Sequence, residues 1–182
     1  PRDDMLASVG EDEVVRLWDA SSGEALGNLP RRSGHTDLAF SVIFDPHGDL
    51  LATTGADGTT IVWDVDNREV AYRFDDHNGA VLSAAFHPTD ELVASASDDN
   101  TVLIYDLSSG DLERRIELAS AAYSVAFTPD GDEVVVGTYS GRIVVAPVDA
   151  DDVVAQANER AGRELTPEEC ERFLHDRGCA DD

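Results

Sequence analysis

The side chains that could do chemistry recur along the chain in a fixed order: a histidine, a hydroxyl, an aspartate and a large aromatic ring. The sets are His35, Thr53, Asp57 and Trp63, then His77, Ser95, Asp99 and Tyr105, preceded by a partial set of Ser8, Asp12 and Trp18. A hydroxyl, an imidazole and a carboxylate are also the components of an acyl-transfer triad. An enzyme needs such a triad once, whereas this combination returns along the chain. The recurrence indicates a structural role, and we predict no catalytic residue.

A repeat of 41 to 45 residues positions these sets. The Trp-Asp pair at 18–19 returns at 63–64 and, as Tyr-Asp, at 105–106, and a fourth copy has decayed to Ala-Pro at 146–147. Two further ladders follow the same rhythm: Phe44, Phe86 and Phe127, and Pro46, Pro88 and Pro129. Three ladders that agree in their spacing predict repeated units of one structure.

Each unit has the pattern of four short strands. In the second unit we expect strands over 38–44, 50–54, 60–63 and 70–74, with a tight turn at Asp57-Gly58. Runs of this length, rich in Val, Ile and Thr and bounded by Gly, Pro, Asn and Asp, are typical of hairpins. Asp-Gly suits a type I′ turn, which needs positive φ at both central residues. Three, four, four and three strands in the successive units predict an all-β fold of 14 strands.

The repeats resemble the WD-repeat (WD40) family, in which Gly-His opens a unit and Trp-Asp closes its third strand. Gly34-His35 and the Trp-Asp pairs carry the resemblance, which covers residues 1–149. It implies a β-propeller fragment of about three and a half four-stranded blades, which is an incomplete ring. It also implies that each His, Ser/Thr, Asp and Trp set is a buried hydrogen-bond chain that holds its unit together.

Two departures from the family pattern concern this chain of bonds. Tyr105 replaces Trp and is expected to donate through its hydroxyl instead. The fourth unit has Val136, Ser140 and Ala146 at the equivalent positions and no opening His, so packing alone should hold it.

A candidate partner-binding surface lies at the start of the first strand of each unit. Phe40 and Leu82 follow the opening histidines by five residues, and Tyr123 is their equivalent in the fourth unit. Glu11 and Asp98, which precede the recurrent aspartates, would lie on the same face. The alternative is that the three apolar residues belong to the core, which their two-residue phase with the rest of the strand supports. Aromatic anchors ringed by acids would favour a basic protein or peptide.

The charge excludes several classes of partner. The 38 acidic residues outnumber 13 bases, all of them Arg, and give a net charge of −25. Such a charge repels nucleic acid and anionic lipid, so neither is an expected partner. No apolar run is long enough to span a membrane. The sequence shows no Gly-rich phosphate loop, so no cofactor is expected. His47 and His87 are predicted to be solvated turn residues rather than metal ligands.

Residues 150–182 lose the strand pattern and are predicted to form a short helical tail. The stretch 162–175 is similar to the ends of bacterial multidomain proteins, in which a WD propeller follows a STAND-type NTPase or another effector. Cys170, His175 and Cys179 match no standard zinc spacing, and no metal site is expected. A Cys170–Cys179 disulfide and two unpaired thiols both stay open.

These observations favour a cytoplasmic, non-catalytic scaffold or sensor module of a larger protein, which binds a protein or peptide. Two other functions stay open. The first is hydrolase or lyase chemistry in the central channel of the propeller. The second is self-association through open blade edges, in which two half-propellers complete one ring.

Overall fold

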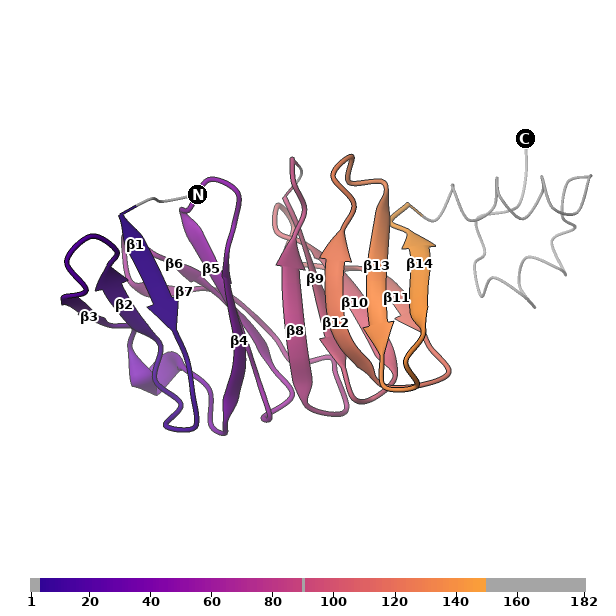
Figure 1. The fold of residues 1–182 in the computed structure, drawn as a ribbon, viewed down its shortest axis with the longest axis horizontal. Helices are drawn as coiled ribbons and strands as arrows, with labels where there is room; N and C mark the ends of the chain where they lie inside the picture. Colours follow the sequence, from indigo (N-terminus) through magenta and orange to yellow (C-terminus); the bar gives the residue numbers. More distant parts are fainter. Residues whose placement is uncertain (1–3, 90, 150–182) are drawn as a thin grey trace, which may run out of the picture. The chain divides into compact units, whose positions relative to one another are not determined.

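The computed structural model describes residues 4–89 and 91–149, and within them the fold is all-β (Figure 1). The chain divides into two compact units, Pro1–Ala146 and Pro147–Asp182. The predicted helical tail, with Cys170, His175 and Cys179, lies outside the described residues. The described part holds 14 strands in four sheets of three, four, four and three strands, which confirms the predicted fold class and strand count.

Each sheet is a meander of consecutive strands that form one blade. Blade 1 consists of β1 (Met5–Ser8), β2 (Arg16–Asp19) and β3 (Ala25–Asn28). A 3-10 turn, η1 (Arg31–Ser33), leads into blade 2, which consists of β4 (Ala39–Phe44), β5 (Leu50–Gly55), β6 (Thr60–Asp64) and β7 (Glu69–Phe74). Blade 3 consists of β8 (Val81–Phe86), β9 (Leu92–Ser97), β10 (Thr101–Asp106) and β11 (Leu112–Glu117). Blade 4 consists of β12 (Ala122–Phe127), β13 (Glu133–Thr138) and β14 (Ile143–Pro147).

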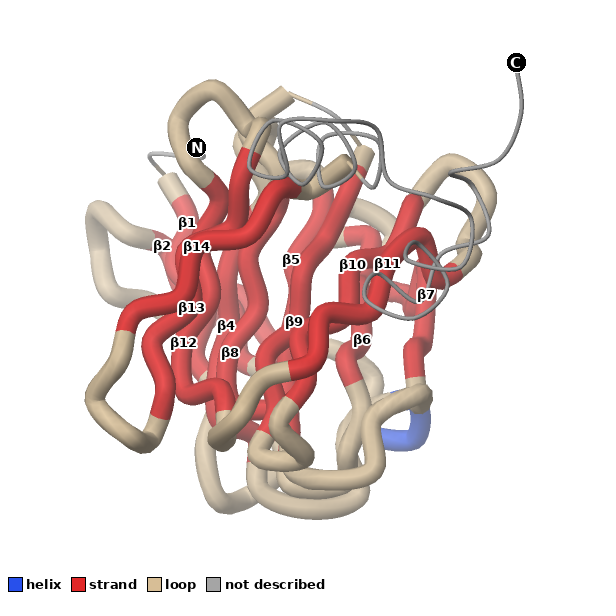
Figure 2. The backbone as a smooth tube through the Cα atoms, turned by 90° about the vertical axis from the view of Figure 1, so that its right-hand side faces the viewer, coloured by secondary structure: helices blue, strands red, loops and turns tan. Residues whose placement is uncertain are grey.

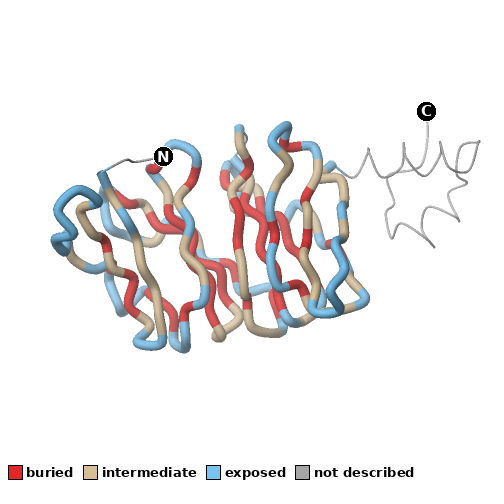
Figure 3. The backbone as a smooth tube through the Cα atoms, viewed as in Figure 1, coloured by how far each residue is buried: buried red, intermediate tan, exposed pale blue. Residues whose placement is uncertain are grey.

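The blades pack face to face, and the first strands β4, β8 and β12 lie side by side (Figure 2). One apolar cluster between blades 1 and 2 includes Leu17, Leu51 and Trp63. A second cluster between blades 2 and 3 includes Val62 and Leu103. Because blades 2 and 3 have a neighbour on each face, their middle strands are buried over most of their length (Figure 3). Burial between blades is what stabilises such repeats, since a single sheet cannot cover both of its faces.

A β-bulge interrupts the first strand of blades 2, 3 and 4 at the same place. Ala39 pairs with Gly55 but Ser41 pairs with Thr54, so Phe40 has no partner residue on β5. The same shift leaves out Leu82 in β8 and Tyr123 in β12. An extra residue in one strand reverses which face the preceding side chains occupy. The two-residue phase that suggested a core position for these three residues therefore does not continue to the start of the strands.

Candidate functional site

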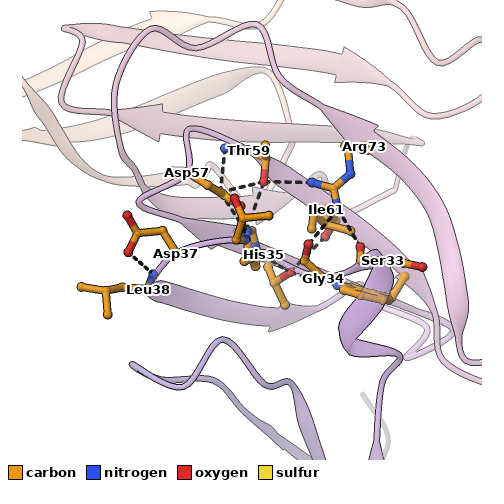
Figure 4. A network of polar contacts seen from close by, with 12 residues as sticks. Ser33, Gly34, His35, Asp37, Leu38, Asp57, Thr59, Ile61 and Arg73 are labelled. Carbon is orange, nitrogen blue, oxygen red and sulfur yellow. Dashed lines mark hydrogen bonds and ion pairs between the residues drawn. The ribbon is translucent and has the colours of Figure 1, made fainter.

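In blade 2, the recurrent polar residues form one continuous hydrogen-bond network (Figure 4). Nδ1 of His35 donates to Asp57 over 3.0 Å, and the hydroxyl of Thr53 donates to Nε2 over 2.9 Å. The indole Nε1 of Trp63 in turn donates to Oγ1 of Thr53 over 2.9 Å. Because the carboxylate can only accept, it sets the tautomer of the imidazole. The chain of bonds thus joins the loop before β4 to the β5–β6 turn and to β6.

Blade 3 repeats this arrangement with one difference. Nδ1 of His77 lies 3.0 Å from Asp99, and Nε2 lies 2.8 Å from the hydroxyl of Ser95. The ring of Tyr105 stacks on Phe74 with a centroid distance of 3.9 Å. Its buried hydroxyl makes no hydrogen bond of normal geometry, so the expected donation from Tyr105 is wrong. Burial, and then the nearby negative charge of an aspartate, raises the pKa of Tyr105.

The sets of blades 1 and 4 are incomplete. In blade 1, Nε1 of Trp18 donates to Ser8 over 2.9 Å, as in blade 2. Asp12 does not join this bond and instead forms an exposed ion pair with Arg16 at 2.5 Å. The described residues before Asp12 offer no histidine to complete the network. In blade 4, Val136 is fully buried and takes the place of the hydroxyl residue.

Two further threonines belong to the networks and were missed by the sequence reasoning. The hydroxyls of Thr59 and Thr101 donate to Asp57 and Asp99 over 2.8 and 2.7 Å, and each lies 3.1 Å from Nδ1 of the neighbouring histidine. Both follow their aspartate by two residues, so their spacing could have revealed them.

Two arginines on the outermost strands, which the sequence reasoning also missed, donate hydrogen bonds to the loops that carry the histidines of the networks. Arg73 of β7 donates from Nη2 to the carbonyl oxygens of Ser33 and Gly34 over 2.6 and 3.0 Å. Arg115 of β11 donates to the carbonyl oxygen of Asp76 over 3.4 Å. The 42-residue interval between the two arginines was a usable signal.

The electrostatics keep the aspartate charged in both networks and favour the neutral form of the histidine in blade 3. Burial opposes ionisation of Asp99, but the Thr101 hydroxyl, the Asn78 amide and His77 outweigh it and lower the pKa of Asp99 to about 2. The pKa of Asp57 is lowered in the same way, as the Thr36 amide and the His35 ring overcome burial. Burial lowers the pKa of His77, and the opposing attraction of Asp99 does not reverse this.

These networks do not have the properties of an active site, although their order of hydroxyl, imidazole and carboxylate is that of a triad. His35 is 2% exposed and Thr53 is fully buried, so a substrate carbonyl has no approach to the hydroxyl. Thr53 also accepts the indole N–H of Trp63, which occupies the oxygen that would attack. The arrangement can hold three segments together, at on the order of 1 kcal/mol for each hydrogen bond.

The candidate partner-binding residues lie at the bulges or beside them, on the side that faces solvent. Phe40 and Tyr123 are 45% and 50% exposed, and Leu82 is half-buried. The amide of Asp98 donates to the carbonyl oxygen of Ala80, which places this exposed carboxylate beside the start of β8. Exposed Glu11 follows Gly10, whose carbonyl oxygen accepts the amide of Ala39 at the start of β4. The structure thus places both acids next to the bulged strands.

The two turn histidines differ from each other. His47 is exposed, as predicted. His87 is only 5% exposed, so the prediction of a solvated residue is wrong for it. Its Nε2 donates to the carbonyl oxygen of Gly131 over 3.1 Å, and its Nδ1 accepts the amide of Thr89 over 3.2 Å. His87 therefore joins blade 3 to the first turn of blade 4, and Phe127 of β12 contacts the ring edge-on.

The described part of the chain shows neither a metal-binding cluster nor a membrane-spanning helix. No group of three or more His, Cys, Asp or Glu side chains there is arranged to hold a metal ion. None of the helical segments within residues 4–89 and 91–149 has the length and hydropathy needed to cross a membrane.

Comparison with protein families supports the repeat. Residues 27–64 and 68–106 match the family model described as WD domain, G-beta repeat. The two matches cover less than half of the chain, and each ends on the aspartate that closes the third strand of its blade. The chain therefore contains WD40 repeats, in the two blades where the hydrogen-bond network includes both the histidine and the aspartate.

Curated relatives match over short segments. A segment of 72 residues is 38% identical to eukaryotic translation initiation factor 3 subunit I of Candida albicans, and covers 40% of this chain and 20% of that protein. A segment of 65 residues is 37% identical to the probable cytosolic iron-sulfur protein assembly protein Ciao1 of Culex quinquefasciatus, with coverage of 35% and 19%. Small ribosomal subunit protein RACK1 of Neurospora crassa is 33% identical over 72 residues, with coverage of 40% and 22%. The matching segments span about a fifth of the length of these relatives.

Proposed function

We propose that this chain is a non-catalytic protein-interaction module that binds a partner protein at the bulged ends of β4, β8 and β12. The observation that carries the proposal is the bulge itself, which recurs in three adjacent blades and excludes Phe40, Leu82 and Tyr123 from the strand pairing. Two of the three side chains are about half exposed although they are aromatic. A row of exposed aromatic and apolar residues on rigid strands is typical of a binding surface.

The surroundings of this row favour a basic partner. Glu11 and Asp98 flank the bulged strands, and the whole chain carries a charge of −25. Acidic residues around an apolar contact steer a positively charged segment toward it and exclude acidic competitors. The ring of Tyr139 lies 5.7 Å from that of Tyr123 and extends the aromatic surface to the turn that follows β13.

The relatives support this class of function. Their names describe a subunit of a translation initiation factor, a ribosomal subunit protein and a protein of iron-sulfur assembly. Scaffolding by repeats of this kind needs no catalytic residue, which agrees with the buried networks.

The experiment is a peptide selection followed by affinity measurements on variants. Peptides selected against the full chain are expected to be rich in Arg and Lys. Phe40→Ser and Tyr123→Ser should each weaken the selected peptide by about tenfold, since aromatic anchors dominate such contacts. The melting temperature should stay within a few degrees of the wild type.

Leu112→Ser is the matched control, because Leu112 is a large apolar residue of similar exposure, 39%, on the outer strand β11. An equal loss of affinity in this control would show that the bulged residues are not a specific surface. Unfolding of Phe40→Ser and Tyr123→Ser would assign these residues to the core and refute the proposal.

The proposal also covers the location of the module and the larger protein to which it belongs. We place the module in the cytoplasm, as the regulatory part of a larger bacterial protein with a STAND-type or similar effector. The similarity of residues 162–175 to such proteins supports this placement. Self-association of the chain through blade edges would appear as a dimer in light scattering.

A further inference from the structure

A cavity of about 400 Å³ lies between blades 2 and 3, at the other end of the strands from the bulged row. The turn that joins β4 to β5, the turn that joins β8 to β9, and strand β7 form its walls. Its apolar lining includes Leu50, Tyr72, Phe86 and Leu107. Cavities of this size with an apolar lining and a few polar groups are typical of ligand sites.

Hydrogen bonds fix the walls of this cavity. Asp45 accepts the amides of Leu50 and His47 over 2.8 and 3.1 Å, which holds the first turn in shape. The hydroxyl of Tyr72 donates to the carbonyl oxygen of Leu107 and so links the two blades across the cavity. A lining held in this way loses little freedom when a ligand binds, and this favours affinity.

Apart from His47 and His87, the ionisable side chains that line the cavity and can carry a charge near neutral pH are acidic. Asp45, Asp49 and Glu91 belong to the lining, and the last two are exposed. Among the described residues that line it, none is an arginine or lysine. The cavity therefore combines aromatic and aliphatic walls with an acidic rim, which suits a cation on an apolar stem.

Arginines are associated with the equivalent position in the neighbouring blades. Between blades 1 and 2, Nη2 of Arg68 donates to the carbonyl oxygen of Leu26 over 3.0 Å. Its guanidinium lies against Gly27, close enough that a Cβ there would be 2.9 Å from Nη1. The strand registers make Gly27 the counterpart of Tyr72, and the counterpart in blade 3 is the half-buried Arg114. An arginine of blade 2 thus lies against this position in blade 1, blade 3 has an arginine at the position itself, and blade 2 has an aromatic ring there.

We propose that the cavity between blades 2 and 3 binds an arginine side chain presented by a partner polypeptide. The guanidinium stacks on the aromatic lining, where Tyr72 and Phe86 lie, and its charge is met by Asp49 and Glu91. A planar, weakly hydrated guanidinium suits such a site better than an ammonium group. This site is separate from the bulged row, and each can be tested without the other.

The test measures binding of acetyl-Gly-Arg-Gly-amide to the full chain by calorimetry at low salt, with amide chemical shifts to locate the contact. The matched ligand replaces arginine by citrulline, which has the same shape without the charge. We expect the arginine peptide to bind and the citrulline peptide to bind at least about tenfold more weakly. Amides at Leu50 and Leu107 should shift most.

The double variant Asp49→Asn/Glu91→Gln should lose about tenfold in affinity for the arginine peptide. The control double variant Asp37→Asn/Glu117→Gln removes two exposed acids from the other end of the strands and should bind as the wild type does. Equal losses in the two double variants would mean diffuse attraction to a chain of charge −25 and would overturn the proposal. The same holds if no binding is detected, if citrulline binds as well, or if butylguanidine binds but the peptide does not.

Discussion

Thr53→Val tests whether the buried network stabilises blade 2 as its geometry indicates. The two side chains have nearly the same shape, so the substitution removes a hydroxyl and leaves the packing unchanged. Oγ1 of Thr53 is the junction of the network, where the Trp63 indole donates and from which His35 accepts. Without it, both partners stay buried and lose a hydrogen bond.

The magnitude follows from the number of groups left without a partner. Each buried donor or acceptor that loses its partner costs about 1–3 kcal/mol. Two such groups, Nε1 of Trp63 and Nε2 of His35, give an expected loss of about 2–6 kcal/mol in the free energy of unfolding. Both side chains are almost fully buried, so water cannot replace the lost bonds without a rearrangement.

The adjacent residue provides a matched control. Thr54 is also fully buried on β5, but its hydroxyl has no hydrogen-bond partner. Thr54→Val therefore removes an unsatisfied group and should be neutral or stabilise by about 1 kcal/mol. The same argument applies to its cross-strand neighbour Thr60, whose counterpart in blade 3 is already Val102.

The assay is urea unfolding of the full chain, followed by tryptophan fluorescence for the blades that contain Trp18 and Trp63 and by circular dichroism for all strands. Agreement between the two probes would show that unfolding is cooperative enough for free energies to be compared. The reasoning is refuted if Thr53→Val costs no more than Thr54→Val, because burial and chemistry are the same at the two positions.

Two other perturbations have clear expected outcomes. Because burial lowers the pKa of His77 below 6.5, its neutral ring contributes stability that is complete above pH 6.5 and is lost as the pH falls through the lowered value. The urea midpoint should therefore drop between pH 7 and pH 5, equally in a variant that replaces the exposed His47 by Asn; a flat profile would contradict the assignment. Gly131→Ala should destabilise more than Gly141→Ala in the same assay, since both have positive φ, but only at Gly131 would a Cβ lie 2.1 Å from the His87 ring. Gly141→Ala should lower the free energy of unfolding by about 1–2 kcal/mol because of the left-handed backbone alone. Equal losses in the two variants would show that the His87 ring can move away from an added Cβ at little cost.

The fold was predictable because its signals repeat. Turn residues and Trp-Asp pairs at one interval predicted the number of strands, 14, and the predicted strands of the second unit differ from the observed ones by one residue at most at each end. The sequence was less informative about which face of its strand each side chain occupies. A bulge adds one residue without changing composition, so the pattern around Phe40 left a core position open, whereas the structure exposes the side chain.

The polar network was predictable only in part. The resemblance named the His, Ser/Thr, Asp and Trp positions, and the structure brings these together in blade 2. It did not indicate that the buried Tyr105 hydroxyl would make no hydrogen bond of normal geometry. Asp12 matched by spacing alone, but without an opening histidine it pairs with Arg16.

The buried network and the bulged row are coupled through the chain that connects them. His35 is fixed to Asp57 and Thr53, and only a short loop separates it from Phe40. The amide of Ala56, next to Asp57, donates to the carbonyl oxygen of Leu38 in that loop. The network therefore holds the strand end that presents Phe40 to solvent. A rigid presentation lowers the entropy cost of binding, so in blades 2 and 3 the network would also prepare the proposed contact surface, whereas blade 4 has the bulge without the network.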